Sequence, residues 1–482
     1  MQGEGTFFGQ PRGLATLFFT EMWERFTYYG MRAVLIFFLV GAVNTGGLGF
    51  DDQTASSIYG LYICATYVFS LLGGWIADRL IGPQRAVIAG GVLIFAGNTL
   101  LAIGQREIFF VGLLVIVLGV GLLKPNISVM VAQLYPEGGS RRDAGFSIFY
   151  TGISVGALLG SWLVSLCVDR YGWHAGFALP ALGMLLGLAY FLSTRRHLVA
   201  SNITVPRSAK AWLPVIILVF AVVILAGLAV AGRIRIDPAA VSSAASWLLG
   251  LLAAGYFLYL LIFAGLSTSE RGRVYVMMML FSAYALFYAG FEQGGASMNL
   301  FAERYTDRRL FGWSFPAGIL QGTTALYTIP LAPAFAALWL ALGKRGKDLS
   351  APAKFATGLA LLSVGTLIMV VPSESVVAGH KVLPIWLLVT YLLQECGDLC
   401  LSPVGLSSMT KLAPPRYVSQ VMGVWFLALA LGNNLAGQLS REYDSTNLES
   451  LPALFLKIFW WTLGAAVVLY CLSPRLARLM RH

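Results

Sequence analysis

Residues 18–32 read FFTEMWERFTYYGMR and decide how the rest of the chain must fold. They lie inside an apolar run from about residue 14 to residue 40, which is long enough to cross a bilayer. The run nevertheless carries Glu21, Glu24, Arg25 and Arg32, and each charge facing lipid at mid-bilayer would cost roughly 2.5–3.5 kcal/mol. At helical spacing these four residues share one face. That face must therefore look into protein or into a water-filled cavity.

The composition is that of a polytopic membrane protein. The 482 residues are 58% hydrophobic and 11% charged, whereas soluble domains are about 25% charged. Residues 1–12 lack a basic segment and a cleavage site, so we predict no removable signal peptide. The net charge of +11 comes mainly from loop residues, which indicate topology rather than nucleic-acid binding. The five cysteines all lie in apolar spans and predict neither disulfides nor a zinc site.

Apolar stretches of membrane-spanning length recur along the whole chain. The predicted spans cover residues 14–40, 55–76, 84–104, 108–132, 144–168, 173–193, 211–231, 244–266, 274–298, 313–341, 354–372, 383–410, 418–439 and 452–473. They predict an all-α membrane protein with a six-helix bundle (1–193), an inserted two-helix segment (194–273) and a second six-helix bundle (274–482). Loops on one side hold twenty Lys and Arg residues against nine on the other, so we expect both termini in the cytoplasm.

Charged residues occur at corresponding places in the two halves. The fourth span of the first half carries Lys124 beside a proline, and its counterpart carries Ser402 beside a proline with Asp398 one turn earlier. The charged first span has its counterpart in the span that contains Glu292. This repetition points to a binding site near the membrane midplane. Two six-helix halves are also the plan of the major facilitator superfamily, which the chain resembles.

Three motifs narrow this resemblance to one family. From Glu21 to Gly30 the chain reads E-x-x-E-R-F-x-Y-Y-G, residues 73–85 contain G-x-x-x-D-R between two spans, and residues 119–128 read GVGLLKPNIS. These motifs resemble those of the proton-dependent oligopeptide transporter (POT/PTR) family of the major facilitator superfamily, in its bacterial 14-helix form. The resemblance covers roughly residues 13–193 and 274–440. It implies a multi-pass protein of the bacterial inner (cytoplasmic) membrane.

The resemblance implies roles for the charged residues inside the predicted spans. The proton-coupling residues that it implies are Glu21, Glu24, Arg25, Lys124 and Glu292. The substrate-binding residues that it implies in the first half are Arg25, Tyr28, Tyr29, Arg32, Tyr67, Lys124 and Ser154. Ser154 stands where the family usually has an asparagine. Lys124 needs an acidic partner, for which Glu21 and Glu24 are the candidates, and Arg32 is the candidate gating partner of Glu292.

The second half carries the remaining implied contacts. Residues 397–407, GDLCLSPVGLS, resemble a family block whose glutamate holds the peptide amino terminus, and Asp398 takes its place here. Glu395 lies on the same helix face and can substitute or assist, whereas Thr324 stands where the family has an asparagine. The substrate-binding residues implied in this half are Glu292, Thr324, Glu395, Asp398, Ser402, Trp425 and Phe426.

The balance of intramembrane charge suggests a mechanism. Three cations face four carboxylates, or five when Glu395 is counted. A buried carboxylate without a cation can take up a proton or hold a peptide ammonium group, while the first-half cations attract a carboxylate. We therefore predict a proton-coupled symporter that imports di- and tripeptides by alternating access. The expected partners are these peptides, protons and the lipid bilayer; we expect a monomer with no cofactor, metal or nucleic acid.

Two other functions compete with this one. The first is proton-coupled transport of another small solute on the same fold, such as nitrate, a drug or a peptide-like compound, which the changes at Ser154 and Thr324 keep open. The second is a membrane-embedded enzyme or a sensor. The sequence contains no Walker A, H-E-x-x-H or Ser-His-Asp pattern, and its four histidines lie at span ends, in loops or at the C-terminus. These features argue against an enzyme.

Overall fold

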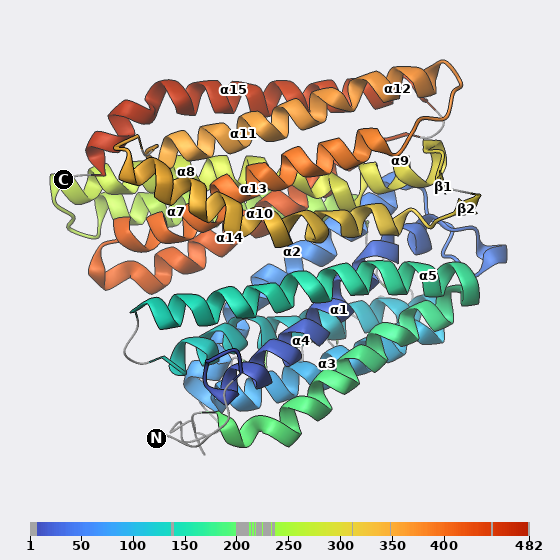
Figure 1. The fold of residues 1–482 in the computed structure, drawn as a ribbon, viewed down its shortest axis with the longest axis horizontal. Coiled ribbons are helices and arrows are strands. Elements are labelled where there is room, and N and C mark those ends of the chain that lie inside the picture. The colour runs from blue at the N-terminus through green and yellow to red at the C-terminus, as the bar shows by residue number, and fades with distance from the viewer. Residues whose placement is uncertain are drawn as a thin grey trace. The chain divides into compact units, whose positions relative to one another are not determined.

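The protein is described here by a computed structural model, which covers residues 7–135, 139–198, 237–310, 312–347, 349–444 and 447–480, and the single residues 212, 213, 215, 217, 224 and 233. Within these residues the chain is helical apart from short turns and one hairpin of two-residue strands (Figure 1). Ten of the described helical stretches are long and apolar enough to cross a membrane. The prediction of an all-helical membrane protein is thus confirmed. The predicted span 211–231 lies almost wholly outside the described residues.

The chain divides into two compact units, and each is considered by itself. Unit 1 comprises residues 1–49 and 65–237, and unit 2 comprises residues 50–64 and 238–482. The helices of unit 1 are α1 (Arg12–Val40), the later part of α2 (Asp52–Ile76), α3 (Pro83–Ile103), α4 (Arg106–Gln133) and α5 (Gly139–Thr194).

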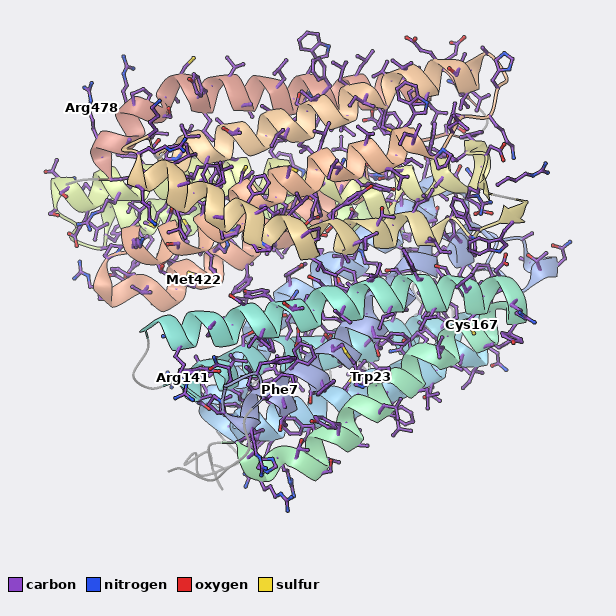
Figure 2. The ribbon with its side chains drawn as sticks, viewed as in Figure 1. Phe7, Trp23, Arg141, Cys167, Met422 and Arg478 are labelled. Atoms are coloured by element: carbon purple, nitrogen blue, oxygen red, sulfur yellow. The ribbon has the colours of Figure 1, made fainter. Side chains whose placement is uncertain are left out.

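Unit 2 contains the first part of α2 and every described element after residue 237. These are α7 (Pro238–Ile262), α8 (Thr268–Phe291), α9 (Ser297–Tyr305), β1 (Arg309–Leu310), β2 (Trp313–Ser314), α10 (Gly318–Lys344), α11 (Ala351–Ile368), α12 (Val370–Val377), α13 (Ile385–Leu412), α14 (Val418–Ser440) and α15 (Ser450–Leu479). The strands β1 and β2 pair antiparallel. Side chains fill the spaces between neighbouring ribbons within each unit (Figure 2).

In unit 1, small residues let α1 lie against both halves of α5. Helix α5 reverses direction at Gly172, where φ is 81°, so it forms the two arms predicted as the spans 144–168 and 173–193 (Figure 1). A Cβ atom on Gly156 or on Gly160 would lie 2.2 Å from a backbone carbonyl oxygen of α1. The glycines on the first arm therefore form a helix-packing surface.

In unit 2, a helix breaks within the predicted span 274–298. Helix α8 ends at Phe291, a 3₁₀ turn covers Glu292–Gly295, and α9 starts at Ser297. Two adjacent glycines in the turn weaken a helix by about 1 kcal/mol each. A Cβ atom on Gly295 would lie 1.7 Å from the Tyr59 hydroxyl, so only glycine allows the turn to pack against α2. Hydropathy did not indicate this break, because these glycines lie in an otherwise apolar run.

Candidate functional site

The charged face of α1 is buried in unit 1. Glu21, Glu24 and Arg25 are 3%, 0% and 3% exposed. Arg25 Nε lies 2.9 Å from Glu21 Oε1 and 2.5 Å from Glu24 Oε2, so one guanidinium faces two carboxylates. The first pair has the i, i+4 spacing, which places both side chains on one side of the helix. The sequence prediction that these charges avoid lipid agrees with this burial.

Lys124 supplies a second positive charge to this cluster. It lies on α4 and interacts electrostatically with both Glu21 and Glu24. No ion pair among the described residues joins Lys124 to either carboxylate, so its pairing with Glu21 or Glu24 stays a prediction. The Oε1 atom of Glu24 is buried and has no hydrogen-bond partner among the described residues. A carboxylate with an unoccupied acceptor atom in such a site is suited to take up a proton.

Tyrosine rings flank Arg25 and Lys124, two of the predicted site cations of unit 1. The Cζ atom of Arg25 lies 5.3 Å from the centre of the Tyr28 ring, and Lys124 Nζ lies 4.1 Å from the centre of the Tyr67 ring. The side chain of Tyr67 also interacts electrostatically with Arg25. Such cation–π contacts hold a cation in a desolvated site without neutralising it. The cations can therefore still attract an anionic group.

The remaining predicted residues of unit 1 lie close to this cluster or along its helices. The Cζ atom of Arg32, one turn beyond Tyr28, lies 5.9 Å from the centre of the Tyr29 ring. Arg32 also interacts electrostatically with Tyr67. Ser154 on α5 donates a 3.4 Å hydrogen bond to the backbone oxygen of Tyr150 in its own helix. The structure thus gives Ser154 a contact within its own helix.

In unit 2, hydroxyl groups surround Asp398. Its Oδ1 atom accepts hydrogen bonds from Tyr288 OH at 3.0 Å and from Ser402 Oγ at 2.5 Å. Tyr284 OH lies 3.0 Å from the same Ser402 hydroxyl, and its ring stacks on Trp425 with the centroids 4.0 Å apart. Residues of α8, α13 and α14 thus fix the Asp398 carboxylate in one orientation.

Glu395 adds a second carboxylate one turn earlier on α13. It is 5% exposed and accepts a 2.6 Å hydrogen bond from Thr328 Oγ1 on α10. Thr328 also contacts the backbone oxygen of Thr324 at 2.9 Å, so the predicted residue Thr324 lies one turn from the carboxylate. Glu395 interacts electrostatically with Asp398. None of the ion pairs among the described residues involves either carboxylate.

Glu292 and Phe426 complete the predicted residues of unit 2. Glu292 is 4% exposed and lies at the break between α8 and α9. Broken helices are a common feature of substrate and ion sites in transporters. Phe426 follows the buried Trp425 on α14 and is half-buried. The structure therefore brings Asp398, Ser402 and Trp425 together, whereas it places Glu292 at a backbone interruption.

Sequence reasoning missed several hydroxyl partners of the charged residues. Tyr288 donates to Asp398 and Thr328 donates to Glu395, while Tyr284 contacts the Ser402 hydroxyl. One signal was present, because Tyr284, Tyr288 and Glu292 are spaced by four residues and share a helix face. Thr328 had no comparable signal, since a threonine in an apolar span is common in helix packing.

Comparison with known proteins identifies the family. The profile of the POT family matches residues 84–454. The chain is 38% identical to a peptide transporter of Yersinia enterocolitica subsp. palearctica serotype O:3 (strain YE-P4), over 100% of this chain and 97% of that protein. It is 36% identical to a di-/tripeptide transporter of Lactococcus lactis subsp. lactis (strain IL1403), over 92% of this chain and 91% of that protein.

Solved structures agree with the sequence comparison. A crystal structure of a mutant peptide transporter POT in complex with alafosfalin matches with a TM-score of 0.90 and 39% identity, over 99% of this chain and 97% of that chain. A crystal structure of a POT family transporter in complex with 5-aminolevulinic acid matches with a TM-score of 0.89 and 33% identity, over 98% of both chains. The chain therefore belongs to the POT family of membrane transporters.

Proposed function

We propose that this protein is a proton-coupled symporter that imports di- and tripeptides by alternating access. Relatives with 38% and 36% identity are a peptide transporter and a di-/tripeptide transporter. Membership of a transporter family excludes the alternative of a membrane-embedded enzyme.

The observation that carries the proposal is the opposite character of the two charged sites. The predicted site residues of unit 1 include three cations (Arg25, Arg32 and Lys124) against two carboxylates, and these cations lie against tyrosine rings. Unit 2 holds Glu395 and Asp398, for which no described ion pair exists. A short peptide carries one carboxylate and one ammonium group at neutral pH. Unit 1 offers partners for the carboxylate, and unit 2 offers partners for the ammonium.

The hydrogen bonds around Asp398 support its role as the ammonium partner. Tyr288 and Ser402 both bond Oδ1, which leaves the other carboxylate oxygen available to a ligand donor. The side chain is one methylene shorter than the glutamate implied by the family resemblance. Glu395, held by Thr328, provides a second acceptor one turn earlier on α13. We propose that the two carboxylates share the work of holding the amino terminus.

The proposed proton site is the α1 cluster. Two carboxylates face one arginine at 2.9 and 2.5 Å, and Lys124 interacts with both. Binding of a peptide carboxylate by Arg25 or Lys124 would weaken their hold on the glutamates. Protonation of Glu24 would offset that loss by removing a buried negative charge. Peptide and proton would then bind together, with Glu21, Lys124 and Glu292 as the other proton-coupling residues.

We also propose the finer topology that the sequence indicates. It has fourteen membrane helices, arranged as six-helix bundles over 1–193 and 274–482 with an inserted pair over 194–273. The bias of loop Lys and Arg residues supports cytoplasmic termini in a bacterial inner membrane. Helix α7 is the second helix of the inserted pair, and Asn434 on α14 donates hydrogen bonds to the Ser242 oxygen and the Ser246 hydroxyl of this helix. We propose that the protein functions as a monomer.

A second candidate is transport of a smaller zwitterion or a peptide-like compound. One similar POT family transporter was crystallised with 5-aminolevulinic acid, and Ser154 and Thr324 here bond to backbone oxygens of their own helices. Competition separates the two candidates. Unlabelled dipeptide should displace labelled dipeptide at a lower concentration than 5-aminolevulinic acid or nitrate does.

Proteoliposomes test the proposed function directly. Labelled dialanine uptake should exceed that of empty liposomes only when an inward proton gradient is imposed, and Asp398→Asn should remove most of it. The matched control is Asp398→Glu, which retains the carboxylate. Uptake equal to that of empty liposomes with several di- and tripeptides would reject peptide transport, whereas gradient-independent uptake would reject proton coupling alone.

A further inference from the structure

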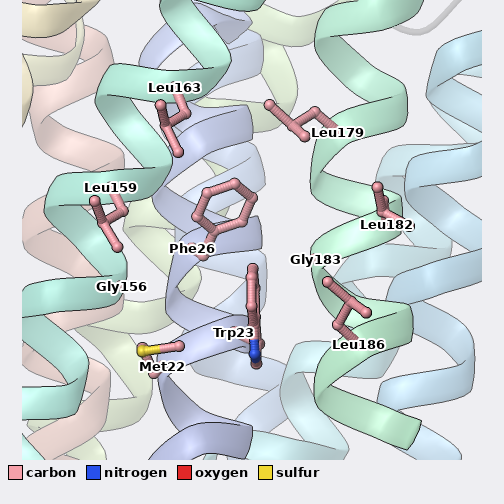
Figure 3. A pocket seen from close by; sticks show the side chains of 10 residues that line it. All are labelled: Met22, Trp23, Phe26, Gly156, Leu159, Leu163, Leu179, Leu182, Gly183 and Leu186. Carbon is pink, nitrogen blue, oxygen red and sulfur yellow. The ribbon is translucent and has the colours of Figure 1, made fainter.

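A groove in unit 1 lies on the side of α1 away from the charged cluster. Its volume is about 170 Å³, and Met22, Trp23 and Phe26 of α1 form its floor (Figure 3). Leucines from the two arms of α5 form the walls on either side (Figure 3). All the side chains that line it belong to Met, Trp, Phe, Leu and Gly residues. The groove therefore offers almost no hydrogen bonds to a ligand.

Glycines on both walls create this groove. A Cβ atom on Gly156 would lie 2.2 Å from the Met22 carbonyl oxygen, and one on Gly183 would lie 2.6 Å from Phe26 Cδ1. The first arm of α5 thus touches the α1 backbone, and the second arm packs directly on the Phe26 ring. The leucines that flank these contacts then project on either side of the α1 surface, and a hollow remains between them (Figure 3). The hollow is a consequence of close helix packing and is built into the fold.

The groove lies at the middle of all three helical segments that form it. Phe26 is the central residue of α1, Gly183 is midway between Gly172 and Thr194, and Leu159 is near the middle of the first arm. The hydrocarbon core of a bilayer is about 30 Å thick, so this level is roughly 15 Å from the headgroups. Wall leucines Leu159, Leu163, Leu182 and Leu186 are 41–51% exposed, so the groove opens at the surface of the chain.

We propose that the groove binds the methyl-terminal part of a membrane lipid acyl chain. An apolar cavity of about 150 Å³ lined by leucine and phenylalanine stays dry and accepts apolar molecules, so water is not the occupant. Headgroups do not reach the bilayer centre, and acyl-chain ends do. An occupant also restores the van der Waals contacts that an empty hollow would forfeit. The chemical class of the ligand is therefore a hydrocarbon chain.

The position of the groove gives this lipid a place in the transport machinery. At 3.6 residues per turn, Glu24 points away from the strip formed by Met22, Trp23 and Phe26. The acyl chain therefore packs on the back of the helix whose front carries Glu21, Glu24 and Arg25. It acts as a positioning contact for α1 and not as a partner of the charges. This inference depends on the membrane fold and not on which solute is transported.

Fluorescence quenching by brominated lipids tests the proposal on the full-length protein. The Trp23 signal is taken as the difference between the wild type and Trp23→Phe in nanodiscs of phosphatidylcholine. We expect bromine near the acyl methyl end to quench Trp23 severalfold more than bromine near the headgroup. After dilution into unbrominated vesicles, Trp23 should recover severalfold more slowly than Trp247, which is 74% exposed on α7 and reports ordinary boundary lipid.

Matched variants show whether the groove itself holds the chain. The double variant Leu182→Phe with Leu186→Phe fills the groove with larger side chains and should reduce the quenching of Trp23. The control, Leu185→Phe with Leu192→Phe, changes two leucines of the same arm that are 42% and 43% exposed and do not line the groove, and should leave quenching unchanged. If the groove-filling variant does not fold, the recovery rates of Trp23 and Trp247 fluorescence in the wild type still test the proposal. Equal recovery of Trp23 and Trp247, equal quenching by both bromine positions, or unquenched Trp23 in a dimeric protein would each overturn the proposal.

Discussion

Lys124 and Tyr67 form a cation–π contact within unit 1, with the Lys124 ammonium 4.1 Å from the ring centre. The two residues come from α4 and α2, so the contact holds together two helices of the charged site. Lys124 also interacts with Glu21 and Glu24 of α1. One ammonium group therefore connects three helices. Its loss would leave Arg25 as the nearest cation for both glutamates.

The contact predicts that peptide affinity depends on the aromatic ring of Tyr67. Tyr67→Leu removes an interaction worth about 0.5–2 kcal/mol, so peptide affinity should fall roughly 2- to 30-fold. Tyr67→Phe keeps the π face and should retain most of the affinity. Dipeptide binding measured by thermal shift or calorimetry checks both. Equal affinity of Tyr67→Leu and the wild type would contradict a binding role for this contact.

The hydrogen bond from Thr328 to Glu395 is expected to support dipeptide binding. Thr328→Val keeps the shape and removes a 2.6 Å bond to a carboxylate, and bonds to charged groups are worth about 1.5–3 kcal/mol. We expect weaker dipeptide binding in Thr328→Val and near-normal binding in Thr328→Ser. A matched control is Thr357→Val, because within the described part of the chain Thr357 bonds to a backbone oxygen of its own helix. Identical binding by Thr328→Val and this control would show that Glu395 needs no support from α10.

A bidentate ion pair joins α2 to α9 in unit 2. Arg304 Nη1 and Nη2 lie 2.8 and 2.7 Å from the two carboxylate oxygens of Asp52. Either single reversal, Asp52→Arg or Arg304→Asp, places like charges together and should lower the thermal stability in detergent. The double reversal should recover it, with a coupling energy of about 1 kcal/mol. Strict additivity of the two single changes would rule out a stabilising pair.

The start of α2 predicts a pH effect outside the membrane-spanning part. Asp51 accepts hydrogen bonds from the Thr54 backbone N–H at 2.8 Å and from the Thr54 hydroxyl at 2.7 Å. Burial of Asp51 acts to raise its pKa, but these bonds outweigh burial and hold the pKa below its usual value. The stabilisation is therefore present above the unfolded-state pKa of about 4 and is lost as pH falls through the lower folded-state pKa.

Substitution of Asp51 tests this helix cap. Asp51→Ala should reduce the free energy of unfolding by about 1 kcal/mol at neutral pH, measured as a lower melting temperature. The difference from the wild type should shrink below about pH 4. Asp51→Asn keeps an acceptor for the backbone N–H and should behave more like the wild type. A melting temperature difference that stays constant down to pH 3 would contradict the ionised cap.

The positions of the helices and of their charges were open to prediction because both leave strong signals. An apolar run of about 20 residues is unmistakable, and four charges inside such a run must face inward. The predicted span 84–104 is α3, Pro83–Ile103, and the predicted span 418–439 is α14, Val418–Ser440. Hydrophobicity fixes these elements almost without reference to tertiary structure.

What escaped prediction depends on packing between helices. The break at Glu292 follows from two glycines and the proximity of Tyr59 to Gly295, and neither alters the hydropathy of the run. The hydroxyl partners Tyr288 and Thr328 are ordinary residues for an apolar span. Their importance appears only when α8, α10 and α13 are side by side. The groove beside Trp23 likewise arises from close contacts between α1 and the glycines of α5.

The central claim is that Glu24 couples proton movement to peptide movement. The Glu24 side chain is fully buried beside Arg25. Glu24→Gln keeps the size of this side chain, but the glutamine cannot gain or lose a proton. In proteoliposomes this variant should lose uptake driven by an inward proton gradient and keep peptide exchange in the absence of a gradient. Full gradient-driven uptake by Glu24→Gln, at the wild-type rate, would contradict the account.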